Sequence, residues 1–368
     1  MWIPLDNPRP SNILFFIQYY VIFIPSCLIV YNTANPVIKH SEAFNLILLM
    51  FIGLSVIQSV YYLPLLKIRY YRLQPELYWF IFFALFILLL AYILYHHVTK
   101  FRIANLKEIY NVRSAFADVV KASGSKLGYY SIMWLSGFFL PFCYAIGIFA
   151  KRWWFVGIMG IGYILLFGII GSKSTLFSLI YFPLIYFWLR YFKIRAFPVL
   201  GLCLSFLLII PFILRIIGLE IIEYWYIAVV NFRTFSIPSL LISQFYDYFN
   251  YHPYTYLSHV KGLNLLIDYP YTLSLPKMLG IYYYGAPIGA NAGFWAGDGL
   301  SGFGPIGIVI MSFFCAILFW LLDSITKPYN TYFVIVTLTF IATSFANISL
   351  FTMILSGGLG FMLIAFYF

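Results

Sequence analysis

The chain has 368 residues, of which 63% are hydrophobic and only 9% are charged, and its formal net charge is +11. A water-soluble domain of this length needs more polar surface than this composition supplies, so the sequence excludes an ordinary soluble enzyme and predicts a protein embedded in lipid. The positive charge predicts anionic partners, either lipid headgroups or a phosphate-bearing substrate. Nucleic acid is disfavoured, because the basic residues are scattered over short loops.

Ten segments contain the run of about 20 mostly apolar residues that a membrane-spanning helix needs. In chain order they are 13–31, 44–66, 77–95, 129–150, 153–171, 174–192, 197–217, 303–323, 329–348 and 350–368. They predict an all-α polytopic membrane protein built as a single integral membrane domain. Two intervening segments, 96–128 and 218–302, are longer than helix–helix connections and are predicted to be external loops.

The orientation follows from the distribution of Lys and Arg, which favour the cytoplasmic side of short loops. Ten basic residues fall on one side, in the runs "KIRYYR" (67–72), "KR" (151–152) and "RYFKIR" (190–195) and at Arg9 and Lys327, whereas the opposite short loops hold only Lys39 and Lys173. Both termini are therefore predicted to be cytoplasmic, and both long loops to face outward.

The external loop 96–128 conflicts with this charge rule, because it carries six basic residues against Glu108 and Asp118. Apolar residues recur in it at helical spacing, which predicts an amphipathic helix in the membrane interface. Arg113 belongs to that helix. It is either a solvated charge or a contact for an external anion.

The loop 218–302 holds twelve tyrosines and five of the eleven acidic residues, and we expect it to contain short helices of its own. Its stretch "FYDYFNYHPYTYLSH" contains Asp247, His252 and His259, each able to accept or donate a proton. Pro253 predicts that one helix ends there and another begins. His252 is the first candidate for a general base, since Pro253 fixes the adjacent backbone and Tyr254 could flank a sugar ring. The alternative is that His252 only forms hydrogen bonds within the loop.

Two further cations lie in apolar surroundings. Lys173, in "GIIGSKSTLF", is either a lysine that reaches the headgroups from a helix end or an anion contact at a helix N-terminus. Arg233, in "NFRTFSIP", offers the planar fork that binds phosphate through two hydrogen bonds.

The glycine-rich run "GANAGFWAGDGLSGFGPIG" (289–307) places Asn291 and Asp298 before a predicted span. Asp298 is either a helix N-cap or another candidate base. The run matches no nucleotide-binding fingerprint. The two histidines and the four cysteines show no metal-ligand spacing, so the sequence predicts neither a metal nor another cofactor.

Four stretches together resemble the bacterial oligosaccharide repeat-unit (O-antigen) polymerases of the Wzy type: "YNVRSAF", "GSKS", "NFRTFSIPSLLISQFYDYFNYHPYTYLSH" and "GANAGFWAGDGLSGFGPIG". Lys173 stands where such proteins more commonly have arginine. The resemblance implies a GT-C-like helical fold in the bacterial inner membrane with its active site facing the periplasm. It also implies a glycosyltransferase for lipopolysaccharide or related polysaccharide biosynthesis, which transfers a growing glycan from undecaprenyl pyrophosphate to the next lipid-linked repeat unit.

In that chemistry an acceptor hydroxyl attacks the anomeric carbon, and undecaprenyl pyrophosphate leaves. Arg233, Arg113 and Lys173 are then candidates for the pyrophosphate, Tyr254 and Asn291 for the sugars, and Asp247, His252, His259 and Asp298 for the base. A polysaccharide chain-length regulator is a further candidate partner. Two other functions compete: an O-antigen ligase, and a transporter or flippase of the lipid-linked oligosaccharide. The near absence of charge within the predicted spans disfavours transport.

Overall fold

The structure is a computed structural model that describes residues 8–30, 37–97, 101–102, 127–260, 263–286 and 295–368, with isolated residues 108, 112, 115, 116, 118 and 120 between them. Within these ranges the chain is helical or irregular, and none of the described residues lies in a strand. Two compact units are present: one formed by residues 1–66, 194–321 and 342–352, the other by 67–193, 322–341 and 353–368.

The first unit begins with a continuous helical run in which α1 (Asn12–Ile17) and α2 (Ile24–Ile29) are joined by the π-helix η1 (Gln18–Phe23). α3 (His40–Ser59) follows and ends in the short 3-10 helix η2 (Val60–Tyr62). The remaining elements of this unit are α10 (Ala196–Ile217), α11 (Glu220–Tyr226), the π-helix η6 (Ile227–Ser236), α12 (Ile237–Tyr251), η7 (Leu263–Leu265), α13 (Leu275–Tyr284) and α14 (Trp295–Phe303).

Trp295 is at the centre of this unit. Its side chain is 1% exposed, and its indole Nε1 donates a hydrogen bond to Oε1 of Gln18 at 3.2 Å. Gly53 of α3 makes room for the ring, because a Cβ at that position would press on the indole and collide with the hydroxyl of Ser312. The sequence thus brings α3, α14 and α15 (Gly307–Thr326) together at one glycine.

The second unit contains α4 (Pro75–His97), α6 (Leu127–Trp134), the π-helix η4 (Leu135–Phe139), α7 (Leu140–Phe149), α8 (Trp153–Ile170), α9 (Lys173–Phe192) and α18 (Leu359–Tyr367). The 3-10 helix η5 (Lys193–Arg195) contains the boundary between the two units. α15, α16 (Thr331–Phe345) and α17 (Leu350–Leu355) contribute residues to both units. Tilted and edge-on phenylalanine rings pack between α4, η4 and α7, and they belong to Phe82, Phe138, Phe139 and Phe142.

Eight helical runs in the described part of the chain are long and apolar enough to cross a membrane: 12–29, 40–62, 75–97, 127–149, 153–170, 173–217, 220–251 and 307–326. The predicted all-α, multi-pass membrane architecture is therefore confirmed. The predicted spans 174–192 and 197–217 fall within one 45-residue run, where α9 and α10 are separated by η5.

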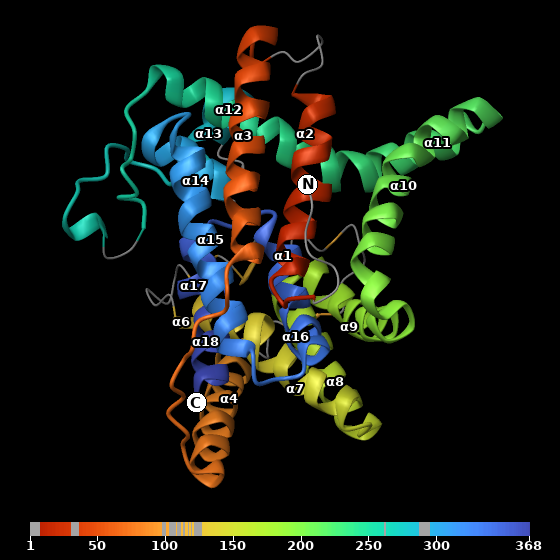
Figure 1. Cartoon of the computed structure of the whole chain (residues 1–368), viewed down its shortest axis with the longest axis vertical. Coiled ribbons are helices and arrows are strands. Elements are labelled where there is room, and N and C mark those ends of the chain that lie inside the picture. The colour runs from red at the N-terminus through yellow and green to blue at the C-terminus, as the bar shows by residue number, and fades with distance from the viewer. Residues whose placement is uncertain are drawn as a thin grey trace. The chain divides into compact units, whose positions relative to one another are not determined.

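Three segments differ from the prediction. The predicted span 329–348 contains the 15-residue helix α16, which is shorter than the eight runs above. The predicted span 350–368 is divided into α17 and α18, because Gly358 adopts a left-handed conformation (φ +96°) that ends one helix and starts the next. The predicted loop 218–302 opens with 32 continuous helical residues, 220–251, and the short helices expected in it follow as η7, α13 and the start of α14. In Figure 1 the α12 part of this run lies crosswise to α3, and the hydroxyl of Ser26 on α2 donates to that of Ser239 on α12 at 3.1 Å.

Candidate functional site

The site begins where α12 ends. α12 stops at Tyr251, and His252 is extended (φ −124°, ψ 155°), as Pro253 requires of the residue before it. The predicted helix end is thus confirmed. The predicted second helix is wrong: residues 256–259 form turns, because Tyr256 (φ +47°) and Leu257 (φ +64°) are both left-handed, which no right-handed helix accommodates.

Backbone hydrogen bonds fasten this turn to the end of α14. The N–H of Thr255 donates to the carbonyl of Ser301 at 2.8 Å, and the N–H of Tyr256 donates to that of Gly302 at 3.2 Å. The last carbonyls of a helix have no partner within the helix, and here the turn supplies their donors. His259, four residues after Thr255, is consequently held beside α14.

α14 is buried on all sides over residues 295–302. It can approach α15 closely because Gly299 and Gly307 face each other, and a Cβ on either glycine would collide with the carbonyl of the other. Asp298 therefore lies in the interior. It is the fourth residue of α14, so it does not occupy the N-cap position of that helix, which was one of its two predicted roles.

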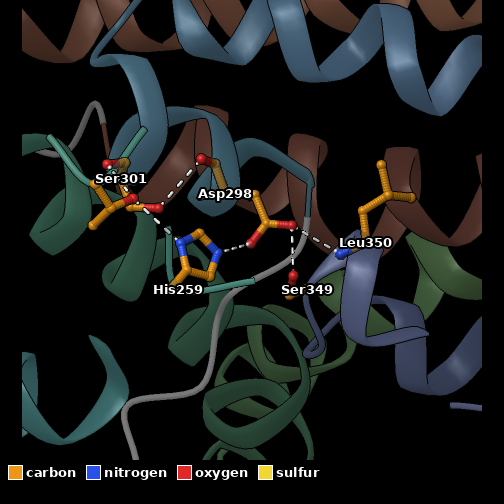
Figure 2. A network of polar contacts seen from close by, with 6 residues as sticks. His259, Asp298, Ser301, Ser349 and Leu350 are labelled. Carbon is orange, nitrogen blue, oxygen red and sulfur yellow. Dashed lines mark hydrogen bonds and ion pairs between the residues drawn. The ribbon is translucent and has the colours of Figure 1, made fainter. Parts of the chain in front are cut away.

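The structure brings His259 and Asp298 together. Figure 2 shows the imidazole directed at the carboxylate, with Nε2 of His259 lying 3.7 Å from Oδ1 of Asp298. The side chain of Asp298 is 3% exposed and that of His259 is 16% exposed. A small part of the imidazole is thus exposed, but its Nε2 is buried, and the carboxylate is enclosed by protein.

The second carboxylate oxygen of Asp298 is held by α17. Oδ2 accepts a hydrogen bond from the hydroxyl of Ser349 at 2.8 Å and another from the backbone N–H of Leu350 at 2.9 Å (Figure 2). Burial raises the pKa of Asp298 above its ordinary value, although His259, Ser349 and Leu350 each act in the opposite direction. The carboxyl group therefore holds a proton more readily than it would in water.

The other ring nitrogen of His259 faces Thr255. Nδ1 lies 3.2 Å from the hydroxyl oxygen of Thr255, and that oxygen lies 3.0 Å from the carbonyl oxygen of Ser301. Thr255 is fully buried. Both ring nitrogens of His259 thus have polar neighbours, Thr255 at Nδ1 and Asp298 at Nε2. A proton can be held on Nε2 of His259 or on Oδ1 of Asp298.

The two other predicted bases lie in separate contacts. Asp247 accepts a 2.6 Å hydrogen bond through Oδ2 from the hydroxyl of Tyr283 on α13, whose pKa is raised first by burial and then by that carboxylate. His252 donates from Nδ1 to the carbonyl of Tyr248 at 2.8 Å, and its ring stacks on that tyrosine with 3.8 Å between centroids. The alternative interpretation of His252, a hydrogen bond within the folded segment, describes these contacts.

Of the predicted substrate-binding residues, Tyr254 is half-buried, and its ring is 6.3 Å from that of Tyr256. Lys173 is the first residue of α9, is half-buried and belongs to the second unit. Arg233 lies in η6, and only its backbone belongs to the described part of the chain. Arg113 and Asn291 also lie outside the described residues, as does most of the predicted amphipathic segment 96–128.

The residues that sequence reasoning missed are Thr255, Ser301, Ser349 and Leu350. The spacing of four between Thr255 and His259 was a weak local signal, but nothing in the sequence connected Asp298 with a serine 51 positions later. Among the described residues, no group of three His, Cys, Asp or Glu side chains is placed to hold a metal ion.

Comparison of the chain with protein families, with characterised proteins and with solved structures found no match. The described residues form an all-helical, multi-pass membrane protein with a histidine–aspartate pair whose carboxylate is buried.

Proposed function

We propose that this protein is a membrane glycosyltransferase with a GT-C-like fold, which joins oligosaccharide repeat units carried on undecaprenyl pyrophosphate at the periplasmic face of the bacterial inner membrane. The observation that carries the proposal is the His259–Asp298 pair, which lies in the tyrosine-rich interval 218–302. Attack by a sugar hydroxyl requires a group that removes its proton, and this pair is equipped for that task.

In this proposal His259 is the general base and Asp298 is its partner. Thr255 engages Nδ1, whereas Nε2 is a buried atom without a hydrogen-bond partner that faces the carboxylate of Asp298. Asp298 is turned toward Nε2 through Oδ1 only, because α17 holds its Oδ2. We therefore propose His259 rather than His252 as the base, since it is His259 that faces a buried carboxylate.

Sugar binding is assigned to the surrounding tyrosines. Tyr251, Tyr256 and Tyr282 are 74%, 52% and 55% exposed, so their rings are available as flat surfaces for sugar rings. Arg233 is proposed to contact the leaving pyrophosphate, with Arg113 and Lys173 as further candidates, since charge-assisted hydrogen bonds to phosphate stabilise the developing negative charge.

The test is the length of the surface glycan after deletion of the gene and its replacement by variants. Loss of a polymerase leaves lipid A capped with a single repeat unit, whereas loss of a ligase or of a flippase leaves no capped lipid A. Wild-type chain should restore the ladder of lengths, and His259→Gln at equal protein level should restore only the single unit. A ladder of normal length in the deletion strain would refute the proposal.

A further inference from the structure

We infer that Thr255 is a positioning residue that keeps a proton on Nδ1 of His259, so that the His259–Asp298 pair stores one exchangeable proton between Nε2 and Oδ1. The arrangement follows from counting donors and acceptors at three atoms. Its catalytic meaning rests on the proposed function, but the arrangement itself does not.

The carbonyl oxygen of Ser301 can only accept hydrogen bonds. The hydroxyl oxygen of Thr255 lies 3.0 Å from it, at hydrogen-bond distance, and a hydroxyl has a single proton. If that proton pointed elsewhere, two oxygen atoms with lone pairs would face each other in a fully buried place, which is unfavourable. The proton of Thr255 is therefore used by Ser301.

Thr255 and His259 are joined by a second contact in this group. Since the proton of Thr255 is already donated, the 3.2 Å contact with Nδ1 must be a hydrogen bond from Nδ1–H to the hydroxyl oxygen. A neutral imidazole carries one proton, so its Nε2 then has only a lone pair. The lone pair is directed at Oδ1 of Asp298, 3.7 Å away.

The carboxylate of Asp298 also needs a compensating positive charge or a proton. An ionised Asp298 facing the lone pair of a neutral imidazole would be a buried anion without a cation, which is costly. One additional proton removes that cost, either on Nε2 or on Oδ1. Oδ2 is not an alternative position, because the hydroxyl of Ser349 and the N–H of Leu350 already donate to it.

The competing arrangement resembles a nucleophilic triad, with Thr255 donating to Nδ1 and Nε2–H donating to Asp298. Two observations oppose it. If the hydroxyl of Thr255 donated to Nδ1, its oxygen would face the carbonyl oxygen of Ser301 at 3.0 Å with no proton between them. Thr255 is also 0% exposed, so its hydroxyl cannot reach a substrate. Thr255 acts through His259 and does not itself react.

The experiment is solid-state NMR of protein labelled with ¹⁵N in its histidine rings and reconstituted in lipid bilayers. Subtraction of the His259→Gln spectrum identifies the two nitrogens of His259. At neutral pH we expect Nδ1 of the wild-type protein to give the signal of a protonated nitrogen. An unprotonated Nδ1 would overturn the inference. Because the signal is measured on the wild-type protein, the test does not depend on whether a Thr255 variant folds.

Thr255→Val removes the hydroxyl at nearly constant volume and should shift the ratio of the two tautomers toward Nε2–H by about tenfold, the effect of losing one hydrogen bond. Thr255→Ser should restore the wild-type signals. Ser258→Ala is the matched control in the same turn, because it removes the 2.6 Å bond to the carbonyl of Thr255 and leaves the hydroxyl contacts in place. A Thr255→Val spectrum identical to that of the wild type would also refute the assignment.

The rate of polymerisation at different pH values provides a second test of Thr255. If the protein polymerises lipid-linked repeat units, Thr255→Val should change the pH profile of the rate and Thr255→Ser should return it. If no polymerisation is found, the NMR result still decides the role of Thr255, so failure of the proposed function and failure of this inference give different outcomes.

Discussion

Asp298 caps a helix that begins 52 residues after it. Its Oδ2 accepts a hydrogen bond of 2.9 Å from the backbone N–H of Leu350, the first residue of α17. The first N–H groups of a helix lack internal partners and carry partial positive charge, so a carboxylate satisfies them in both respects. The same side chain thus faces His259 through one oxygen and fixes α17 through the other.

This double role predicts different effects for two substitutions of Asp298. Asp298→Ala leaves the donors of Ser349 and Leu350 buried without an acceptor, so it should destabilise the fold by about 2–4 kcal/mol. Asp298→Asn keeps one acceptor oxygen, so its cost should be smaller by at least about 1 kcal/mol. Thermal unfolding of the purified protein in nanodiscs measures both. Equal losses in the two variants would show that the cap contributes nothing.

The raised pKa of Asp298 predicts a pH dependence of stability. Below the ordinary value of 3.8 the group is protonated in both states, and its contribution to folding is fully present. As the pH rises from there toward the folded-state pKa, the unfolded chain ionises first, so the folded state loses relative stability by up to about 1.4 kcal/mol per pH unit. His259 is the titratable group that faces the carboxylate.

The measurement is the difference in the free energy of unfolding between the wild type and Asp298→Asn, followed from about pH 4 to pH 8. The wild type should lose stability relative to the variant as the pH increases. The opposite slope would mean that a charged His259 dominates and that the carboxylate is ionised at the lower end of this range.

The contact between α14 and α15 predicts a strong effect at Gly299. Gly299→Ala would force its new methyl group against the carbonyl of Gly307, and backbone cannot move aside as a flexible side chain can. We expect a loss of about 1–3 kcal/mol. Gly157→Ala on α8 is the matched control, since a Cβ there meets nothing within 4 Å and alanine favours a helix. Unfolding temperatures that change equally in both variants would contradict the close contact.

The base assignment predicts unequal losses at the two histidines. His259→Gln should lower the rate of polymerisation of purified lipid-linked repeat units by about 10²- to 10⁴-fold, the contribution of a general base. His252→Gln should retain most of the rate, because the ring of His252 stacks on Tyr248 and its Nδ1 donates to the carbonyl of the same residue. A reversed order of the two losses would return the role to His252.

The predicted orientation can be tested with cysteine labelling in intact spheroplasts. Tyr256 is 52% exposed and Tyr71 is 65% exposed. A membrane-impermeant reagent can therefore reach a cysteine at either position when it is added to the side of the membrane on which that residue lies. Ser258, in the same turn as Tyr256, is buried and unsuitable. Tyr256→Cys should label and Tyr71→Cys should not, in a background in which Cys27 and Cys203 are serine. Labelling at Tyr71 instead would place the candidate site in the cytoplasm.

Several features could be predicted from local sequence because their cause is local. Pro253 ends α12 in the structure as predicted, since the steric effect of proline on the preceding residue does not depend on the rest of the fold. The turn after it was mispredicted as a helix, because what holds Thr255 and Tyr256 there is the end of α14, some 46 positions later.

The membrane-embedded helical architecture is readable in the amino-acid sequence, because burying a backbone in lipid demands long apolar helices, and these are visible as apolar runs. The sequence also determined which side chains could carry a proton. Only the tertiary structure decided that His259 and Asp298 form the pair, because a turn, a helix and the start of α17 converge there from distant parts of the chain. The periodicity of a sequence reports which face of a helix is apolar, and it does not report which distant residue that face will meet.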